Sequence, residues 1–177
     1  MIDRRAFLTI AGGVAGGALL WPAAHALADA HEAKPASTDL AEAIDTSGFV
    51  YVSPLKSDGS ESTCHGEVWF GPFGDGVVLI TAATTWKARA LGQGLDRARV
   101  WVGDHGRWKQ LVGRNEAFRK APSFDARAEI VKDDALLEEL LALYDKKYPD
   151  EIADWRDKMR SGYHDGSRLL IRYTPVS

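Results

Sequence analysis

The sequence predicts a mainly β domain of the α+β class, in which about six to seven short strands form a barrel with helices packed outside it. Three observations predict this class. Short β-branched and aromatic runs recur between clusters of turn residues, which is typical of strands joined by turns. Two runs with helical spacing precede the last strand-like run. Strands this short cannot leave both edges of a sheet bare, so a closed or nearly closed barrel is expected.

The expected strands are residues 49–52, 67–70, 77–81, 99–103, 107–112, 125–131 and 168–173. Residues 67–70 and 77–81 flank a segment dense in Gly, Pro and Asp, which predicts that they form a β-hairpin. Residues 107–112 are expected to continue the meander. Residues 125–131 alternate apolar with polar side chains, which predicts a half-buried strand.

Three helices are expected. The clearest covers residues 133–148, because an apolar stripe is flanked by acidic residues at its start and lysines at its end, and Pro149 stops it. A second helix is expected over residues 151–160. A short helix over residues 86–92 follows two threonines, and the hydroxyl of Thr85 is expected to cap it.

Composition limits the class of protein. The length of 177 residues fits one main domain, and 45% apolar with 27% charged residues exclude a fibre or a disordered tail. The net charge of −3 gives no electrostatic reason to expect nucleic acid or an anionic membrane as the main partner. The single cysteine, Cys64, excludes an internal disulfide and a multi-cysteine metal site, and no metal site is predicted.

The first 28 residues resemble a bacterial twin-arginine export signal. Arg4 and Arg5 precede an apolar run over residues 6–21, which is followed by Ala-Leu-Ala at residues 26–28, a small-x-small cleavage pattern. A general secretory signal and a short uncleaved anchor are the alternatives. The prediction is a periplasmic or exported protein that meets the twin-arginine machinery and keeps no stable membrane anchor after cleavage.

Behind the signal, residues 29–47 are predicted to be a flexible lead-in, with one helical turn over residues 40–44. The folded domain is predicted over residues 48–175. The twin-arginine route carries proteins that have already folded, commonly with a cofactor in place, which favours a bound cofactor here.

The most informative stretch is the corner between the strand at 77–81 and the helix at 86–92. It delivers Thr84 and Thr85 to a helix start whose first amides have no internal acceptor, and Lys87 and Arg89 add positive charge. Hydroxyls, free N–H groups and cations together are typical of a phosphate pocket. A capped helix with two solvated cations is the alternative that the residues leave open.

This corner resembles the pyridoxamine 5′-phosphate oxidase-like family of flavin-binding split barrels. In that family a strand ends in Thr, and a Ser or Thr follows four residues later. Next come a basic residue, a Lys, a residue of any type, and an Arg or Lys. A Leu stands two residues after that. The matching positions are Gly76, Thr81, Thr85, Lys87, Arg89 and Leu91. The resemblance covers roughly residues 45–175, and the order of elements also fits.

The resemblance implies a split β-barrel homodimer that binds FMN at the subunit interface and acts on a small-molecule substrate as an oxidoreductase. It places the flavin phosphate at Thr85, Lys87 and Arg89, with Thr81 near the ribityl chain or the ring edge. It also implies that Trp69 and the backbone of residues 65–68 line the flavin ring. The candidate cofactor-binding residues are Thr81, Thr84, Thr85, Trp86, Lys87, Arg89, His65 and Trp69.

The chain departs from the family pattern at two cations. Trp86 stands where the oxidase has a second basic residue, and it is expected either to pack or to cover the cofactor. His65 falls where the family has an upstream phosphate-binding arginine. The substrate-binding residues of the vitamin B6 oxidase are not found, so that activity is not predicted and no catalytic residue is assigned.

Some members of this group use a deazaflavin, some bind haem, and others have no known cofactor. The second hypothesis is therefore a non-catalytic module that binds flavin, deazaflavin or haem as a carrier or sensor. A third is a barrel without a cofactor, kept for an interaction surface.

Several other residues carry expectations. Core or interface packing is expected for Trp101, Trp108 and Trp155. The thiol of Cys64 is expected to be buried and inert. Arg168 and Arg172 share one face of the last strand and are expected to pair with Glu129 on the surface or to reach the cofactor.

Overall fold

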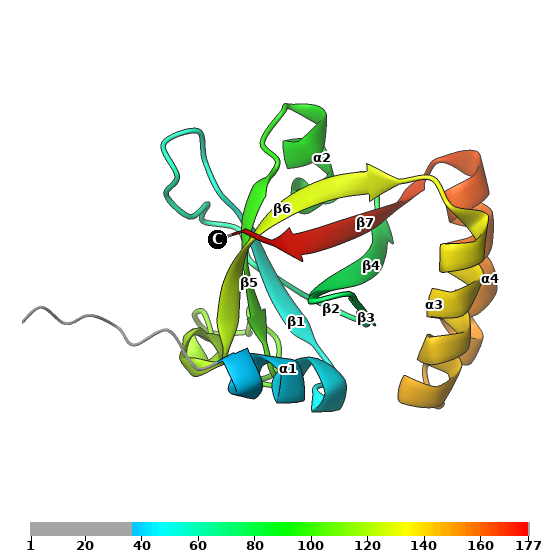
Figure 1. Cartoon of the computed structure of the whole chain (residues 1–177), viewed down its shortest axis with the longest axis horizontal. Helices are drawn as coiled ribbons and strands as arrows, with labels where there is room; N and C mark the ends of the chain where they lie inside the picture. The colour runs from blue at the N-terminus through cyan, green and yellow to red at the C-terminus, as the bar shows by residue number, and fades with distance from the viewer. Residues whose placement is uncertain (1–36, 177) are drawn as a thin grey trace, which may run out of the picture. The chain divides into compact units, whose positions relative to one another are not determined.

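The computed structural model describes residues 37–176 (Figure 1). The predicted export signal and residues 29–36 of the lead-in lie outside the described residues. The strands are β1 (Val50–Pro54), β2 (Gly66–Val68), β3 (Gly71–Phe73), β4 (Gly76–Ala82), β5 (Arg97–Val102), β6 (Ser123–Val131) and β7 (Arg168–Pro175). The helices are α1 (Ser37–Thr46), α2 (Trp86–Gly92), α3 (Asp134–Lys147) and α4 (Ile152–Asp165), with a 3₁₀ turn η1 (Ala117–Lys120).

The seven strands form one antiparallel sheet in the order β2-β1-β5-β6-β7-β4-β3. The edge strands β2 and β3 are separated in the chain only by residues 69–70, so the two edges of the sheet come together and the sheet curls almost into a barrel. The predicted class, a mainly β barrel of six to seven strands with outer helices, is confirmed.

Apolar residues fill both faces of this sheet. On β4, Val77 and Leu79 belong to the core inside the curl, whereas Val78 and Ile80 pack on the other face against α3 and α4. Successive strand residues point to opposite faces, so a strand covered on both sides needs an unbroken apolar run. This explains why residues 77–80 read Val-Val-Leu-Ile.

The predicted hairpin between residues 67–70 and 77–81 is wrong. In the structure β2 pairs with β1, and the short strand β3 pairs with β4 across the turn. The expected strand breaks at Trp69 and Phe70, because tyrosines of α3 and its C-cap bind their backbone. The hydroxyl of Tyr144 donates to the carbonyl oxygen of Trp69 (2.9 Å), and the Phe70 N–H donates to the hydroxyl of Tyr148 (3.2 Å).

The strand predicted over residues 107–112 is also wrong. This segment is a loop with a single antiparallel bridge between Lys109 and Arg114. Leu111 and Val112 at its tip are 106% and 88% exposed, so no strand within residues 37–176 pairs with them.

The helices differ from the expectations at their ends. α3 begins as expected, with the Asp133 side chain accepting from the Leu136 N–H (3.0 Å). α4 continues beyond residue 160 to the left-handed Gly166 (φ 80°), which ends it. α1 is longer than the single turn expected for its segment, and its Ile44 is buried in the core. No helix within residues 37–176 combines the length and the apolar character needed to span a membrane.

Candidate functional site

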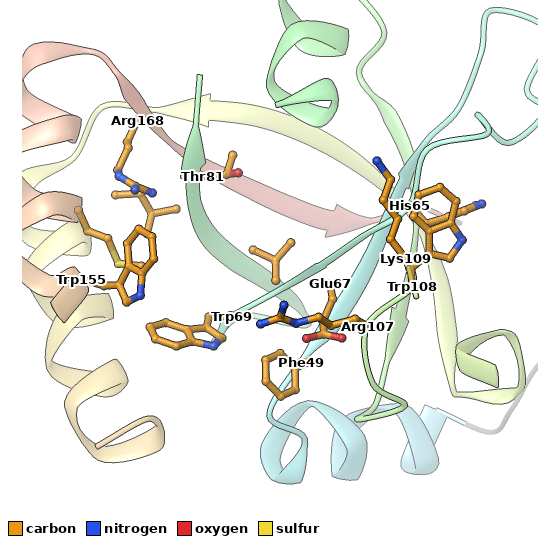
Figure 2. Close-up of a pocket in the computed structure, with 13 residues that line it drawn as sticks. Phe49, His65, Glu67, Trp69, Thr81, Arg107, Trp108, Lys109, Trp155 and Arg168 are labelled. Atoms are coloured by element: carbon orange, nitrogen blue, oxygen red, sulfur yellow. The ribbon is translucent and has the colours of Figure 1, made fainter. Parts of the chain in front are cut away.

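A cleft with a volume of about 670 Å³ lies on this domain (Figure 2). It is formed by residues of β2, the end of β4, the loop after β5, α4 and the start of β7, together with the residue before β1. Its aromatic walls are Phe49, Trp69, Trp108 and Trp155. Aromatic faces of this kind suit a ligand with a planar ring.

The charged residues of the cleft are mostly cations. Arg107, Lys109 and Arg168 line it, with Glu67 as its one carboxylate. Within residues 37–176 none of the three cations forms an ion pair. Lys109 and Arg168 instead lie over tryptophan rings, 5.7 Å and 5.3 Å from the centroids of Trp108 and Trp155. The cleft therefore favours an anionic ligand.

The cleft lies at a seam in the barrel. β3 pairs only with the first part of β4, residues 76–78, so on that side the end of β4 has no strand beside it. β2 pairs only with β1. Val68 of β2 and Ile80 and Thr81 of β4 line the cleft between these two free edges. Thr81 is thus the residue of the predicted corner that lines the cleft, whereas Thr85 and Lys87 are not among its lining residues.

Of the predicted site residues, Thr81, Thr85 and Lys87 belong to the inner side of this seam. Thr81 lies two residues after Leu79 on β4, so its side chain points to the same face as Leu79, which is part of the inner core. The hydroxyl of Thr81 lies 3.4 Å from that of Thr85. The expected cap by Thr85 is absent, because its hydroxyl donates to the Ala82 carbonyl instead (2.8 Å).

Lys87 is largely buried, and no residue within 37–176 gives it a charged partner. A Cβ placed on Gly66 would lie 2.9 Å from the Lys87 Nζ, so the amine touches β2 where only glycine leaves room. Gly66 pairs with Val52, a residue of the inner core, which puts this contact on the inner face. Burial lowers the pKa of Lys87 to about 8, and no carboxylate within residues 37–176 pairs with the amine.

The other predicted residues of the corner lie further out. Thr84 and Arg89 are exposed. The guanidinium of Arg89 lies 5.8 Å from the centroid of the Trp86 ring, and Trp86 Nε1 is buried without a hydrogen-bond partner among the described residues. The structure therefore brings Thr81, Thr85 and Lys87 to the seam and leaves Thr84 and Arg89 on the surface beside it.

His65 and Trp69 lie on the outer side of the seam. His65 packs against Trp108 and Phe118, with ring centroids 5.3 Å and 5.4 Å away. Its Nε2 is 3.3 Å from a guanidinium nitrogen of Arg119, and because a guanidinium only donates, Nε2 accepts and the proton sits on Nδ1. Burial, with a smaller effect from Arg119, lowers the pKa of His65, so the ring is neutral at pH 7.

Trp69 is held by α3. Its ring stacks on Tyr148 with centroids 4.4 Å apart and an angle of 7° between the planes. The Tyr148 hydroxyl donates to the Gly48 carbonyl oxygen (2.6 Å). This fixes one aromatic wall of the cleft between the barrel and the helices.

Several lining residues were not predicted from the sequence. Glu67 and Arg107 lie in segments predicted to be strands, where a charged side chain is expected to face the solvent. A usable signal was present at residues 105–115, which hold three cations and no carboxylate. Arg168 also lines the cleft, whereas Arg172 pairs with Glu129 as expected.

Of the expectations for the other tryptophans and for Cys64, some are confirmed and others are wrong. Trp101 and Trp108 are buried as expected, whereas Trp155 is 42% exposed at the rim of the cleft. The expectation of a buried thiol at Cys64 is wrong, because Cys64 is exposed in a loop where its backbone carbonyl binds the Ser62 hydroxyl (3.1 Å). The structure shows no group of three or more potential metal ligands in the part of the chain it describes.

The sequence matches no protein-family model and no curated protein. Solved structures do match. The haem storage protein HutZ from Vibrio cholerae aligns with a TM-score of 0.51 and 18% identity, over 79% of this chain and 89% of its own. A conserved hypothetical protein from Mycobacterium tuberculosis aligns with a TM-score of 0.52 and 17% identity, over 79% and 80%. A candidate pyridoxamine 5′-phosphate oxidase from Listeria innocua aligns with a TM-score of 0.50 and 10% identity, over 80% and 94%.

The fold is a split β-barrel. At these identities the likeness concerns the fold alone. In this split barrel the free edges of β2 and β4 form the split, and the cleft with its cations and aromatic walls lies along it.

Proposed function

We propose that this protein binds FMN along the seam of the split barrel and acts as a flavin-dependent oxidoreductase on a small molecule. The observation that carries the proposal is the buried amine of Lys87, which has no carboxylate partner among the described residues. A buried cation without a counter-charge is unfavourable, and an anionic ligand group supplies that charge. The phosphate of the flavin is an anionic group that supplies this counter-charge.

The residues at the seam fit such a group. The hydroxyls of Thr81 and Thr85 are within 3.4 Å of each other on the inner side, where Lys87 adds its charge. The buried Trp86 Nε1 is a hydrogen-bond donor that still lacks an acceptor among the described residues. Trp69 on the outer side offers a fixed aromatic face for the ring. Both ends of an FMN molecule therefore meet suitable chemistry.

The protein's own contribution is to bind and to orient. Bound flavin supplies the electron or hydride transfer. Thr81, Thr85 and Lys87 hold the phosphate, and the aromatic walls of the cleft exclude water from the ring. Arg89 lies on the surface beside this corner and adds positive potential, and the neutral Thr84 offers a hydroxyl there.

A haem or deazaflavin carrier or sensor is the second candidate function. His65 favours the haem version, because its imidazole lines the same cleft and its Nε2 becomes a free ligand atom once the contact with Arg119 opens. A neutral imidazole is a suitable haem-iron ligand. The name of the Vibrio cholerae neighbour, a haem storage protein, adds to this candidate.

The absorption spectrum of the purified protein separates these functions. We expect flavin bands; a Soret band favours the haem candidate, and a colourless protein that takes up neither FMN nor haem contradicts both. Lys87→Ala combined with Thr85→Ala is expected to weaken FMN binding at least about tenfold, through the loss of two hydrogen bonds to a charged group. Lys56→Ala, an exposed lysine far along the chain from the corner, is the control.

Turnover separates an enzyme from a carrier. An oxidoreductase is expected to be reduced by a nicotinamide donor and reoxidised by an acceptor over many cycles. A protein that holds flavin but does not cycle supports the carrier or sensor.

We also propose that the protein is a homodimer and that the twin-arginine route exports it to the periplasm. The dimer is supported by the fully exposed Leu111 and Val112 beside the cleft. Export is supported by Arg4 and Arg5 in the sequence. Cell fractionation of a variant with both arginines changed to lysine tests export, since the precursor is then expected to stay in the cytoplasm.

A further inference from the structure

Glu67 is a carboxylate in the cleft that no cation neutralises directly. It lines the cleft from β2 and forms no ion pair within residues 37–176. Its one hydrogen-bond contact among the described residues is with the Tyr51 hydroxyl, which lies 3.4 Å from Oε2. Burial, with a smaller effect from Asp104, raises the pKa of Glu67, and the Tyr51 hydroxyl and then Arg107 oppose the rise. The carboxylate therefore keeps acceptor capacity that the chain does not use.

Tyr51 leaves that capacity free. Its side chain is fully buried, and its hydroxyl donates to the Gly106 carbonyl oxygen (2.8 Å) and accepts from the His105 N–H (2.9 Å). A phenol has one proton to donate, and the shorter contact with Gly106 takes it. The same hydroxyl thus fixes the loop just before Arg107 and touches Glu67, so both residues are positioned relative to one anchor.

Arg107 faces the same space. It lines the cleft next to Glu67 (Figure 2), and its guanidinium also forms no ion pair within residues 37–176. Phe49 and Trp69 provide the aromatic surfaces beside them. The carboxylate of Glu67, an acceptor, and the planar guanidinium of Arg107, a donor, therefore lie next to each other beside these aromatic rings without forming an ion pair.

We propose that Glu67 and Arg107 bind the edge of a heterocyclic ligand on which an N–H stands next to a C=O. The carboxylate accepts from the N–H, and the guanidinium donates to the carbonyl oxygen. The inference rests on the proposed function only in placing the ligand in this cleft. Of the ligands that the proposed function involves, two carry such an edge: the pyrimidine part of a flavin, and the carboxamide of a nicotinamide donor. Haem has no such edge and gains no contact from the pair.

Riboflavin is the probe, because it has the ring edge but no phosphate and so does not depend on Lys87. Its dissociation constant is measured by fluorescence quenching with the full chain and with Glu67→Ala, Arg107→Ala and the double variant. Each single change is expected to weaken riboflavin binding at least about fivefold. The double variant is expected to weaken binding by less than the product of the two single effects, because the two contacts are coupled. Lys120→Ala, an exposed cation of η1 outside the cleft lining, is the control.

Two further measurements identify the edge. Riboflavin methylated at N3 lacks the N–H, so it is expected to bind the wild type more weakly than riboflavin does. The Glu67→Ala variant is expected to bind riboflavin and the methylated compound with the same affinity. Glu67→Gln keeps an acceptor oxygen and is expected to recover part of the affinity. Haemin affinity is expected to be the same in all variants, which also shows that their clefts remain folded.

The nicotinamide arm distinguishes the two sources of the edge. If nicotinamide mononucleotide binding falls in Glu67→Ala and Arg107→Ala while riboflavin binding does not, the pair recognises the electron donor. If neither probe changes affinity in any variant, the proposal is overturned. A wild type that binds no flavin contradicts the proposed function, and the nicotinamide arm still decides the role of the pair.

Discussion

The amine of Lys87 lies against Gly66, on the inner face of β2, with 2.9 Å between the Nζ and the position that a Cβ would take. The contact joins the short helix α2 to the free edge of the sheet across the seam. It gives Gly66 a role that its backbone conformation does not require, because its φ is not in the left-handed region.

Gly66→Ala tests this contact. The new methyl group meets the far end of a flexible side chain, so we expect the fold to tolerate the change and the amine to move. FMN binding is expected to weaken by roughly tenfold, the size of one displaced charge-assisted hydrogen bond. Isothermal titration with FMN measures it. Gly92→Ala, where a Cβ meets nothing within 4 Å, is the control. Unchanged FMN affinity in Gly66→Ala would place the phosphate elsewhere.

Lys87→Met is expected to stabilise the ligand-free protein at neutral pH. The folded-state pKa of about 8 lies below the ordinary value of 10.5, so the unfolded chain binds more protons between these values. Wild-type stability therefore rises as the pH increases from about 8 to 10.5 and is lower below this window. The methionine variant lacks this dependence and is expected to gain roughly 2 kcal/mol at pH 7.

Urea unfolding at pH 7 and at pH 10.5 measures the effect. Burial also lowers the pKa of Lys147 to about 8, but this lysine is present in both proteins and cancels in the difference between them. The same variant is expected to lose FMN binding, so it becomes more stable and less able to hold the ligand. Equal stability of the two proteins at pH 7 would show that the amine is solvated.

Tyr148→Phe tests how α3 holds the wall of the cleft. The hydroxyl donates to the Gly48 carbonyl oxygen and accepts from the buried Phe70 N–H, and the variant leaves both groups without this partner. A destabilisation of about 1–3 kcal/mol is expected for an unsatisfied buried group. The stack on Trp69 survives, because the ring remains. Denaturant unfolding measures the loss, and a change below about 0.5 kcal/mol would mean that water replaces the hydroxyl.

The sequence predicts the parts of the fold whose pattern is local. The apolar stripe of α3, the cap at Asp133 and the alternation in β6 follow from spacing alone, and each is present. The break between β2 and β3 does not follow from spacing. It depends on Tyr144 and Tyr148, which stand more than 70 residues later in the chain.

The candidate site shows the same limit. The motif at Thr81, Thr85 and Lys87 is visible in the sequence because its residues are close together in the chain. Its meeting with Gly66 across the seam is not visible, because it depends on how the sheet curls. The place of Arg107 is hidden for a related reason, since the pattern of its segment resembles a strand but the described part of the chain offers it no partner strand.

The last prediction concerns the homodimer. Leu111 and Val112 project from the loop that also carries Arg107 and Lys109 to the cleft, and both are almost fully exposed. In a dimer that covers this loop, each buried aliphatic side chain contributes about 1.5–3 kcal/mol. Changing both to serine is therefore expected to raise the dimer dissociation constant at least about tenfold, with little change in the stability of the monomer.

Sedimentation velocity over a range of concentrations measures this shift. Ile130→Ser is the matched control, because Ile130 is also an exposed aliphatic residue, 42% exposed, but stands on β6 away from the loop. The dimer is expected to persist in this control. A serine double variant that dimerises as the wild type does would place the interface on another surface. A wild type that is monomeric at all concentrations would contradict the homodimer itself, and FMN binding by that monomer would show that one chain completes the site.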